Sequence, residues 1–490
     1  MYVFLLGILQ QPLTRCFVGR AIQIDVLPDD VLLGIFDFCA NQDVAQDPRF
    51  LLPIPTKKDI EAWQPLVHVC RRWRTVVFGS SRRLKVQLVC TAKTPARETL
   101  NVWPALPLSI RGYGNYPTES VDNIIAVLER SDRVCQINLM DVPSSLLEEL
   151  SAAMQKPFLE LTHLELSSYD EAVSVLPDSF LGGSAPRLQF LWLDGVPFPG
   201  LPGLLSSATH LVHLHLCGIP HSGYISPEAM VTSLSTLTNL KSLWLEFQSP
   251  LSCPDRASRR PPPLRRSVLR VLTSLRFKGV SEYLEDFVAR IDTPRLLHLS
   301  ITFFNQIAFD TPQFIQFISR TPKLKLDKAH VAFEVGAASV NFSSQTSGYG
   351  ELDVKVSCKE SDWQLSSLEQ VCTSTLPPLS TLEGLFIHET SYPQPQWQDN
   401  VENALWLELL HPFMAVKNLY LSKEFAPRVA PALQELVGGR TTEVLPTLQN
   451  IFLEGHPSSS GPVQEGIGQF VATRQVTRRP VAVSRWDRWF

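Results

Sequence analysis

Four histidines lie close together in the sequence, and they are the residues whose type and spacing most directly suggest chemistry. His210, His213, His215 and His221 form the only dense histidine group. On a β-strand His213 and His215 would share one side, because alternate residues do, and two imidazoles placed in this way could bind a transition metal. No carboxylate lies nearby in sequence to complete the ligand set, and Cys217 would fall beyond the turn. The group therefore favours polar surface residues, and no metal site is predicted.

Motifs for bond-making chemistry are missing from the sequence. It contains no G-x-G-x-x-G, G-x-x-x-x-G-K-[ST], H-E-x-x-H or G-x-S-x-G, which mark phosphate-binding loops, zinc proteases and serine hydrolases. No catalytic residue and no cofactor are therefore predicted, and we expect a protein that is not itself an enzyme. The nine cysteines are spread thinly without a C-x-x-C pair, which indicates free thiols and an intracellular location, cytoplasmic or nuclear.

Short leucine patterns of the form L-x-x-L-x-L recur through most of the chain and would position any binding residues. Their starts lie 23 to 34 residues apart, except for one long gap before Leu382. One strand per unit at such a period is typical of a solenoid, in which each repeat covers the hydrophobic face of its neighbour. The apolar intervals at 144–154, 226–237, 280–291 and 311–319 predict helices or extended returns. The patterns are VCQINL from Val134, LTHLEL from Leu161, LQFLWL from Leu188, LVHLHL from Leu211, LKSLWL from Leu240, LTSLRF from Leu272, LLHLSI from Leu296, LEGLFI from Leu382, VKNLYL from Val416 and LQNIFL from Leu448.

Aromatic and histidine side chains occupy one position of this pattern, between its last two apolar residues. In a strand that position faces away from the leucines, so these side chains would lie on the open side of the solenoid. Aromatic side chains are typical anchors of protein interfaces. The alternative is that loops fold over this face and make the aromatics ordinary core. The residues predicted to bind a target protein are Trp192, His213, His215, Trp244, Phe386, Tyr420 and Phe452.

The repeats lack the Asn or Cys that fixes the turn of regular leucine-rich repeats. The corresponding positions hold other residues, among them Tyr169, Val196, Ile219, Val280 and Phe304. A ladder of side-chain amides cannot hold these turns. We therefore expect an uneven solenoid that carries insertions.

Two amphipathic helices are predicted between residues 25 and 83. The first begins at Pro28, which suits the first helical position, and places on one face Val31, Leu32, Ile35, Phe36 and Cys39. The second runs from Pro65 to Gly79 with its apolar residues at Leu66, Val69, Cys70, Trp73, Val76 and Val77. Residues 41–63 between them are predicted to form a surface insertion.

This region resembles an F-box, in which Leu-Pro opens one helix and L-V-x-V-C-[KR]-x-W-[KR] forms the next. The matching residues are Leu27, Pro28, Val31, Ile35, Phe36, Leu66, Val69, Cys70, Arg71, Trp73 and Arg74. The insertion at 41–63 departs from most F-boxes. Together with the phrase CTAKTPARETLNVWPALPL at 90–108 and the irregular repeats, the arrangement is similar to the F-box family expanded in mushroom-forming (basidiomycete) fungi.

The resemblance implies a substrate-recognition subunit of an SCF-type (cullin–RING) E3 ubiquitin ligase. The F-box would bind a SKP-type adaptor, and through it a cullin, while the repeats would bind a target protein. Two alternatives stay open: the helices simply cap the solenoid, or the chain is a non-ligase repeat scaffold with a degenerate F-box. The residues that the resemblance assigns to adaptor binding are Leu27, Pro28, Val31, Leu32, Ile35, Phe36, Leu66, Val69, Cys70 and Trp73.

Composition bounds the remaining possibilities. The chain has 490 residues, of which 44% are hydrophobic and 19% charged, against roughly 25% charged in an average soluble protein, so global disorder is excluded. The net charge of −4 does not favour nucleic acid, and the apolar stretch Tyr2–Leu9 is too short to span a membrane. The predicted fold is α plus α/β: an uncertain segment 1–24, an F-box at 25–83, a connection at 84–129, an irregular leucine-rich-repeat solenoid at 130–456 with a Pro/Arg-rich insert at 249–267, and a disordered tail at 457–490.

Overall fold

The computed structural model has a mixed α/β fold, in which a small helical group precedes one large sheet. Fourteen α-helices and a sixteen-stranded sheet are found in the part of the chain that the structure describes. That part is residues 27–40 and 63–486, with gaps at 82, 85, 92, 115, 117, 171–173, 254–264, 305–309, 325–326, 345–349, 359–360, 375–378, 390–401, 437–442 and 456–460. The predictions for segment 1–24, for nearly all of the insertion at 41–63 and for the middle of the insert at 249–267 lie outside the described residues.

The sheet is open and mostly parallel, with the strand order β1-β2-β3-β4-β5-β6-β7-β9-β11-β14-β13-β12-β15-β16-β17-β18. A separate two-stranded sheet joins β8 (Ser267–Val268) to β10 (Ile291–Asp292). The large sheet consists of β1 (Leu88–Thr91), β2 (Leu108–Tyr113), β3 (Val134–Met140), β4 (His163–Ser167), β5 (Phe190–Asp194), β6 (His213–Ile219), β7 (Ser242–Phe247), β9 (Ser274–Gly279), β11 (His298–Phe304), β12 (Lys328–Glu334), β13 (Ala337–Ser343), β14 (Glu351–Ser357), β15 (Gly384–Glu389), β16 (Asn418–Leu421), β17 (Asn450–Glu454) and β18 (Ala482–Trp486).

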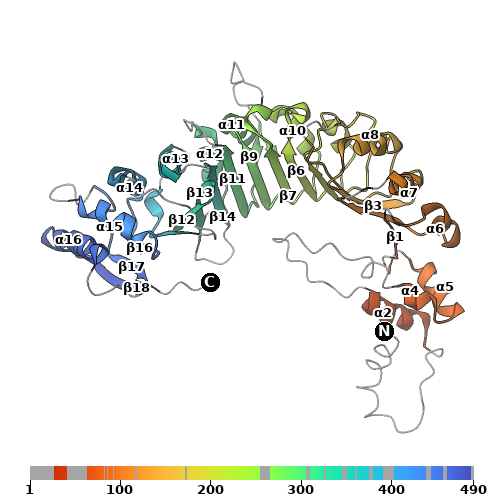
Figure 1. Ribbon diagram of the computed structural model, residues 1–490, viewed down its shortest axis with the longest axis horizontal. Coiled ribbons are helices and arrows are strands. Elements are labelled where there is room, and N and C mark those ends of the chain that lie inside the picture. Colours follow the sequence, from red (N-terminus) through yellow and green to blue (C-terminus); the bar gives the residue numbers. More distant parts are fainter. Residues whose placement is uncertain are drawn as a thin grey trace, which may run out of the picture.

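Helices line the outer side of an arch, and the sheet lines its inner side (Figure 1). Short 3-10 turns replace helices at Phe180–Gly183, His221–Gly223, Pro250–Ser252 and Leu379–Thr381. Most consecutive helices of the outer row contact one another. They are α6 (Ala96–Val102), α7 (Thr118–Leu128), α8 (Ser144–Ala153), α9 (Leu201–Leu205), α10 (Pro227–Leu234), α11 (Ser281–Val288), α12 (Pro312–Arg320), α13 (Ser361–Ser374), α14 (Asn403–Leu410), α15 (Ala426–Gln434) and α16 (Pro462–Val476).

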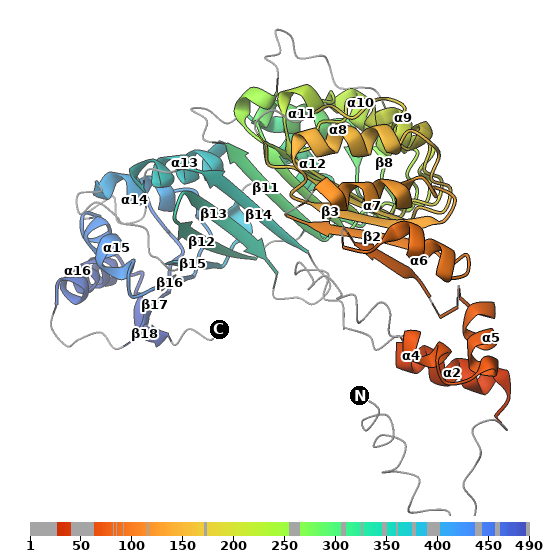
Figure 2. The ribbon, with the colours of Figure 1, turned by 45° about the vertical axis from the view of Figure 1, so that its right-hand side comes forward.

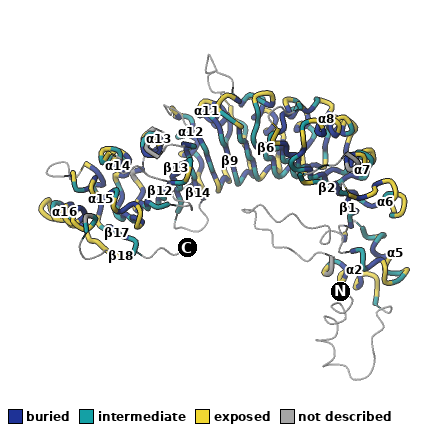
Figure 3. Tube along the Cα trace, viewed as in Figure 1, coloured by how far each residue is buried: buried dark blue, intermediate teal, exposed yellow. Residues whose placement is uncertain are grey.

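The leucine pattern produces the sheet because its apolar residues all turn toward the helices. In β5, Leu191 and Leu193 are buried whereas Trp192 between them is half-buried on the other side, and the same alternation repeats along the arch (Figure 3). All ten predicted strand patterns are strands, and the four predicted intervals contain α8, α10, α11 and α12. Burying every leucine row against the next repeat is the main driving force for this arrangement.

The long gap in the pattern contains an antiparallel insertion, which one strand per repeat did not predict. Strands β12 and β13 form a hairpin through a turn at Val335–Gly336, where Gly336 has a φ of +80°. Strand β13 is antiparallel to both of its neighbours, while β14 pairs with β11 and β12 pairs with β15 in parallel. The chain therefore crosses this part of the sheet in reverse order.

Two of the predicted boundaries are wrong. The region 84–129 is not a connection, because β1, α6, β2 and α7 already belong to the sheet and its helical row. The tail is not disordered from residue 457 on, since α16 buries Ile467 and Phe470 against the last repeats and β18 pairs with β17. Both regions bury apolar residues, but these residues do not have the L-x-x-L-x-L spacing, so the leucine pattern did not include them.

Main-chain hydrogen bonds hold the turns in place of side-chain amides. Ser168 N donates to Asp194 O (2.9 Å), and Gly195 N donates to Cys217 O (2.9 Å), so each turn is bonded to the next one along the sheet. Gly195 has a φ of +70°, in the left-handed region that favours glycine. This backbone ladder explains how turns without a conserved Asn can still stack.

A buried arginine fixes the turn that precedes β17. The Arg474 side chain on α16 is fully buried, and its guanidinium donates to the carbonyls of Val444 (3.0 Å) and Leu445 (2.7 Å). Leu445 has a φ of +47°, which is costly for a residue with a side chain. The arginine therefore stabilises a strained turn as well as satisfying buried acceptors.

Candidate docking and recognition surfaces

The helical group at the N-terminus has a hydrophobic core of its own. Helices α2 (Asp29–Ala40), α4 (Gln64–Val67) and α5 (Arg71–Gly79) lie beyond the β1 end of the sheet (Figures 1 and 2). Leu32 and Phe36 of α2 are fully buried in a cluster with Trp63 and Val77, separate from the core of the arch. Phe36 also contacts Trp73, with ring centroids 4.7 Å apart.

The second predicted helix is broken into two, which corrects the sequence interpretation. Cys70 has an extended backbone (φ −156°, ψ 171°) and caps α5, its Sγ accepting a hydrogen bond from Trp73 N at 3.5 Å. The Arg74 Nε donates to Val67 O at 3.0 Å and ties the two helices together. A local side-chain cap thus competes successfully with continuation of the helix.

An apolar stripe on α2 faces solvent, and we call Val31, Ile35 and Phe38 the α2 stripe. Their exposed fractions are 42%, 37% and 75%, and their spacing of four and then three residues places them on one side of the helix. Val69, between α4 and α5, is also 55% exposed. Large apolar side chains grouped on one helix face and left in water are typical of a protein-binding surface.

The structure divides the ten predicted adaptor-binding residues between surface and core. Sequence reasoning missed Phe38, which has the helical spacing that could have identified it. The core members cannot contact a partner directly and instead hold the stripe in place. Exposed are Pro28, Val31, Ile35 and Val69; half-buried are Leu27, Cys70 and Trp73; buried are Leu32, Phe36 and Leu66.

On the inner face of the sheet, one row of side chains runs from strand to strand across the arch, and we call it the central row. The strand register places six of the seven predicted target-binding residues in this row. His213 lies in the adjacent row, opposite Phe190 and Ser242. From β4 onward, in sheet order, the central row is Glu165, Trp192, His215, Trp244, Arg276, Ser300, Asp353, Asn341, His330, Phe386, Tyr420, Phe452 and Ser484.

The C-terminal part of the central row is a ladder of stacked rings. Centroid distances are 4.3 Å from His330 to Phe386, 4.0 Å from Phe386 to Tyr420 and 4.4 Å from Tyr420 to Phe452, with the planes within 8° of parallel. Trp486 meets Phe386 and Tyr420 edge-on. Because the faces of the inner rings are already stacked, this ladder stabilises the sheet and offers a partner mainly ring edges.

A pocket of about 310 Å³ opens beside this ladder. Its wall combines two aromatic rings with polar groups of both charges, so it is a shallow polar recess rather than an apolar ligand cavity. It is lined by Asp327, Lys328, Thr381, Glu383, Gly384, Phe386, Asn418 and Tyr420.

The N-terminal part of the central row is a compact cluster of Trp192, His215 and Trp244. The two indoles lie on either side of His215, with ring centroids 6.0 and 5.6 Å from the imidazole and 6.3 Å from each other. His215 Nε2 shares a hydrogen bond with Ser242 Oγ at 3.1 Å. Burial, reinforced by the nearby charges of His213 and Arg276, lowers the pKa of His215 to about 4.

We predict that His215 makes the protein less stable in mild acid. At pH 7 the imidazole is neutral in the folded and in the unfolded chain. As the pH falls from 6.5 toward about 4, the unfolded chain takes up a proton that the folded chain excludes. This difference lowers the free energy of unfolding by up to about 3 kcal/mol. Urea unfolding at pH 7 and pH 4.5 measures the loss. His215→Gln should lose less stability between these two values than wild type, and His221→Gln should not differ from it. An equal loss in wild type and His215→Gln would contradict the prediction.

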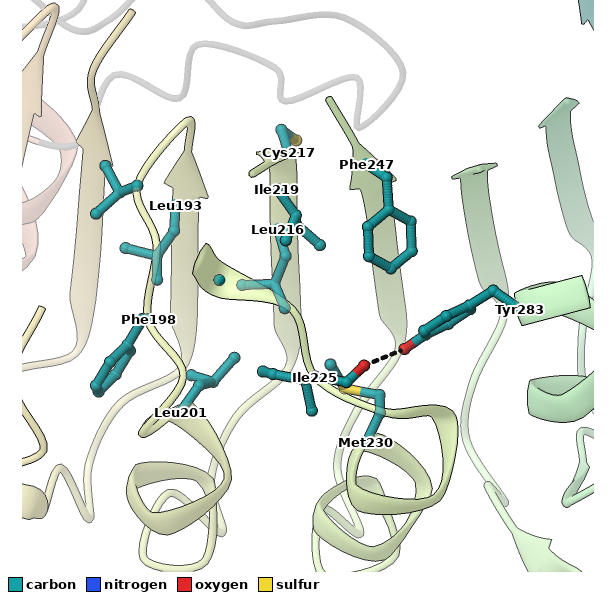
Figure 4. Close-up of a pocket in the computed structure, with 12 residues that line it drawn as sticks. Leu193, Phe198, Leu201, Leu216, Cys217, Ile219, Ile225, Met230, Phe247 and Tyr283 are labelled. Atoms are coloured by element: carbon teal, nitrogen blue, oxygen red, sulfur yellow. Dashed lines mark hydrogen bonds between the residues drawn. The ribbon is translucent and has the colours of Figure 1, made fainter. Parts of the chain in front are cut away.

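A second, smaller cavity lies inside the arch. A small cavity of about 20 Å³ between β5–β7 and the helices has room for about one water molecule; its lining is apolar except for Tyr283, whose hydroxyl donates to Ile225 O at 3.1 Å (Figure 4). Over the described ranges, no three His, Cys, Asp or Glu side chains are grouped to bind a metal. None of the described helices combines the length and apolar character needed to cross a bilayer.

Sequence comparisons identify no relative: the chain matches no family model and no curated protein.

Proposed function

We propose that this chain is the substrate-recognition subunit of an SCF-type ubiquitin ligase. In this proposal the helical group is an F-box that binds a SKP-type adaptor, and the arch is an irregular leucine-rich-repeat solenoid that binds a target protein. The chain would contribute binding and proximity, raising the concentration of the target near the ubiquitin-transferring enzymes.

The α2 stripe is the observation that carries the proposal. A helical group with its own core has no internal need for Val31, Ile35 and Phe38 at the surface, so their exposure favours an external partner. The group also projects beyond the sheet instead of lying along it (Figure 2), which favours docking over a purely structural cap. The central row supplies the second surface, with Trp192 and Trp244 as candidate anchors.

Co-purification of the full-length chain with a SKP-type adaptor tests the proposal. Wild type should retain the adaptor, and Ile35→Asp combined with Phe38→Asp should weaken the complex by at least about thirtyfold, because each change places a charge in an apolar contact. Both side chains are exposed, so circular dichroism should show a folded variant. Trp73 is a poor choice for this test because it packs on Phe36.

Leu159→Asp is the matched control, since Leu159 is an apolar side chain of similar exposure (55%) between α8 and β4. It should bind the adaptor like wild type. If wild type binds no adaptor, the ligase proposal fails and the chain is better explained as a repeat scaffold with a degenerate F-box. If the double variant binds as well as wild type, the α2 stripe is not the docking surface.

A further inference from the structure

Arg276 is an exposed arginine in the middle of the central row, between Trp244 on β7 and Ser300 on β11. Its Cζ lies 4.4 Å from the centroid of the Trp244 ring, so the guanidinium is held by stacking on an aromatic face. Within the described chain it forms neither an ion pair nor a hydrogen bond. A stacked guanidinium keeps its N–H donors available in a fixed plane.

Two other arginines near the surface are held by carboxylates. Arg72 pairs with Asp29 (2.6 Å) and Arg187 pairs with Glu160. In contrast to these two, Arg276 has its position fixed by a ring and not by a carboxylate.

Other polar side chains lie on the same side of the sheet as Arg276, along strands β5 to β9. The indole Nε1 atoms of Trp192 and Trp244 and the Nδ1 atom of His215 are buried and accept or donate no hydrogen bond in the described structure. Ser274, two residues before Arg276, faces the same side of the sheet. The ring nitrogens are covered by neighbouring atoms, so Ser274, and not the rings, can offer a further hydrogen-bond donor next to the fixed cation.

The charges around the cluster favour an anion. Burial lowers the pKa of His213 as well as that of His215, and the charged groups that lower them further are all basic: Lys241 and His163 act on His213, and Arg276 acts with His213 on His215. Two of the nearby carboxylates are engaged by other side chains. Glu246 pairs with Lys278 at 2.5 Å, and Glu165 accepts hydrogen bonds from Asn138 and His163.

We propose that Arg276, held by Trp244 and accompanied by Ser274 on the same strand, is a subsite for the oxyanion of an acidic or phosphorylated side chain in the target polypeptide. This inference deepens the target-binding half of the proposed function and rests on it. The planar guanidinium presents paired N–H groups that match the oxygens of a carboxylate or phosphate. The Ser274 hydroxyl supplies a further donor on the same strand.

Fluorine NMR of the full-length chain labelled with 5-fluorotryptophan tests the subsite. The probes are N-acetyl-phosphoserine amide, N-acetyl-glutamate amide and N-acetyl-serine amide, each titrated at constant ionic strength. The resonances of Trp192 and Trp244 are assigned from the signal that disappears in Trp192→Phe and in Trp244→Phe. We expect both resonances to shift saturably with the phosphoserine probe. Arg276→Gln should raise the probe concentration needed for half of the maximal shift by about tenfold or more. Arg187→Gln, which removes a charge that already has a carboxylate partner, should leave the titration unchanged.

A response to phosphoserine alone would assign the subsite to phosphorylated targets, and a response to glutamate of similar strength would assign it to acidic ones. A shift with neutral N-acetyl-serine amide of the same size, no saturable shift with any probe, or an equal response in Arg276→Gln would overturn the inference. No adaptor takes part in this measurement, so its failure leaves adaptor docking untouched, and loss of adaptor docking leaves this result untouched.

Discussion

Replacing Arg474 by alanine is expected to lower the free energy of unfolding of the C-terminal end of the sheet by about 3 to 5 kcal/mol. The change removes the guanidinium donor from the buried carbonyls of Val444 and Leu445, of which Leu445 O keeps a hydrogen bond from Leu448 N at 3.1 Å. It also removes the side chain that lies over the Phe470 ring, 5.1 Å from its centroid. The buried Val444 carbonyl, which loses its donor, and the loss of the packed arginine side chain account for most of the expected loss.

Amide hydrogen exchange is the suitable measurement for Arg474→Ala, because the ends of a repeat array open separately from its middle. Protection should fall in β17, α16 and β18 and stay unchanged in β4–β7. Arg479→Ala is the control, since Arg479 is exposed and donates to Pro446 O at 2.9 Å; it should cost under about 1 kcal/mol. If the two substitutions lower amide protection equally, burial of the Arg474 side chain does not explain its contribution to stability.

Gly195→Ala is expected to destabilise the arch by about 3 kcal/mol or more. Gly195 has a φ of +70°, and a Cβ added there would lie 2.0 Å from the carbonyl oxygen of Ser168. The main chain that blocks the Cβ is itself hydrogen-bonded into the turn ladder, since Ser168 N donates to Asp194 O. Relief of the clash therefore requires two neighbouring repeats to move. Urea unfolding followed by tryptophan fluorescence measures the effect.

Gly34→Ala provides the opposite case. Gly34 is exposed on α2, has no neighbour within 4 Å of a new Cβ, and lies in a helix interior, where alanine is favoured over glycine by about 0.5 to 1 kcal/mol. It should stabilise the helical group slightly. If Gly34→Ala and Gly195→Ala change the free energy of unfolding in the same direction, the explanation from backbone conformation and available space is wrong.

The sequence predicts those parts of the fold in which one residue type repeats at fixed spacing. Leu191 and Leu193, with their equivalents in other repeats, are recognisable because a strand with one buried face alternates. Strand β2 contains Leu108 and Ile110 without the full pattern, so it was missed. The antiparallel insertion was missed for a topological reason: alternation in β13 gives a strand but not its direction or its neighbours.

The candidate surfaces are predicted in type better than in detail. The helical pattern of α2 locates the apolar residues, yet it cannot say that Phe36 turns inward and Phe38 outward, because this depends on where α4 and α5 lie. Arg276 occupies the same pattern position as Trp192 and Trp244, so the sequence pattern could have placed it on the inner face. Its significance depends on the stacking contact with Trp244, which only the folded sheet creates.

The reversed order of strands between β11 and β15 has a consequence for the timing of synthesis. Each strand of the large sheet up to β11 can pair with the strand of that sheet made before it, but β12 emerges next and has no place beside β11, whose partner is β14. The ribosome must make the stretch from Phe304 to Ser357 before β11 is covered, which takes roughly 3 to 10 s at typical elongation rates. During this interval the nascent chain carries a finished N-terminal half with an open sheet edge, the state in which strand edges aggregate and chaperones bind.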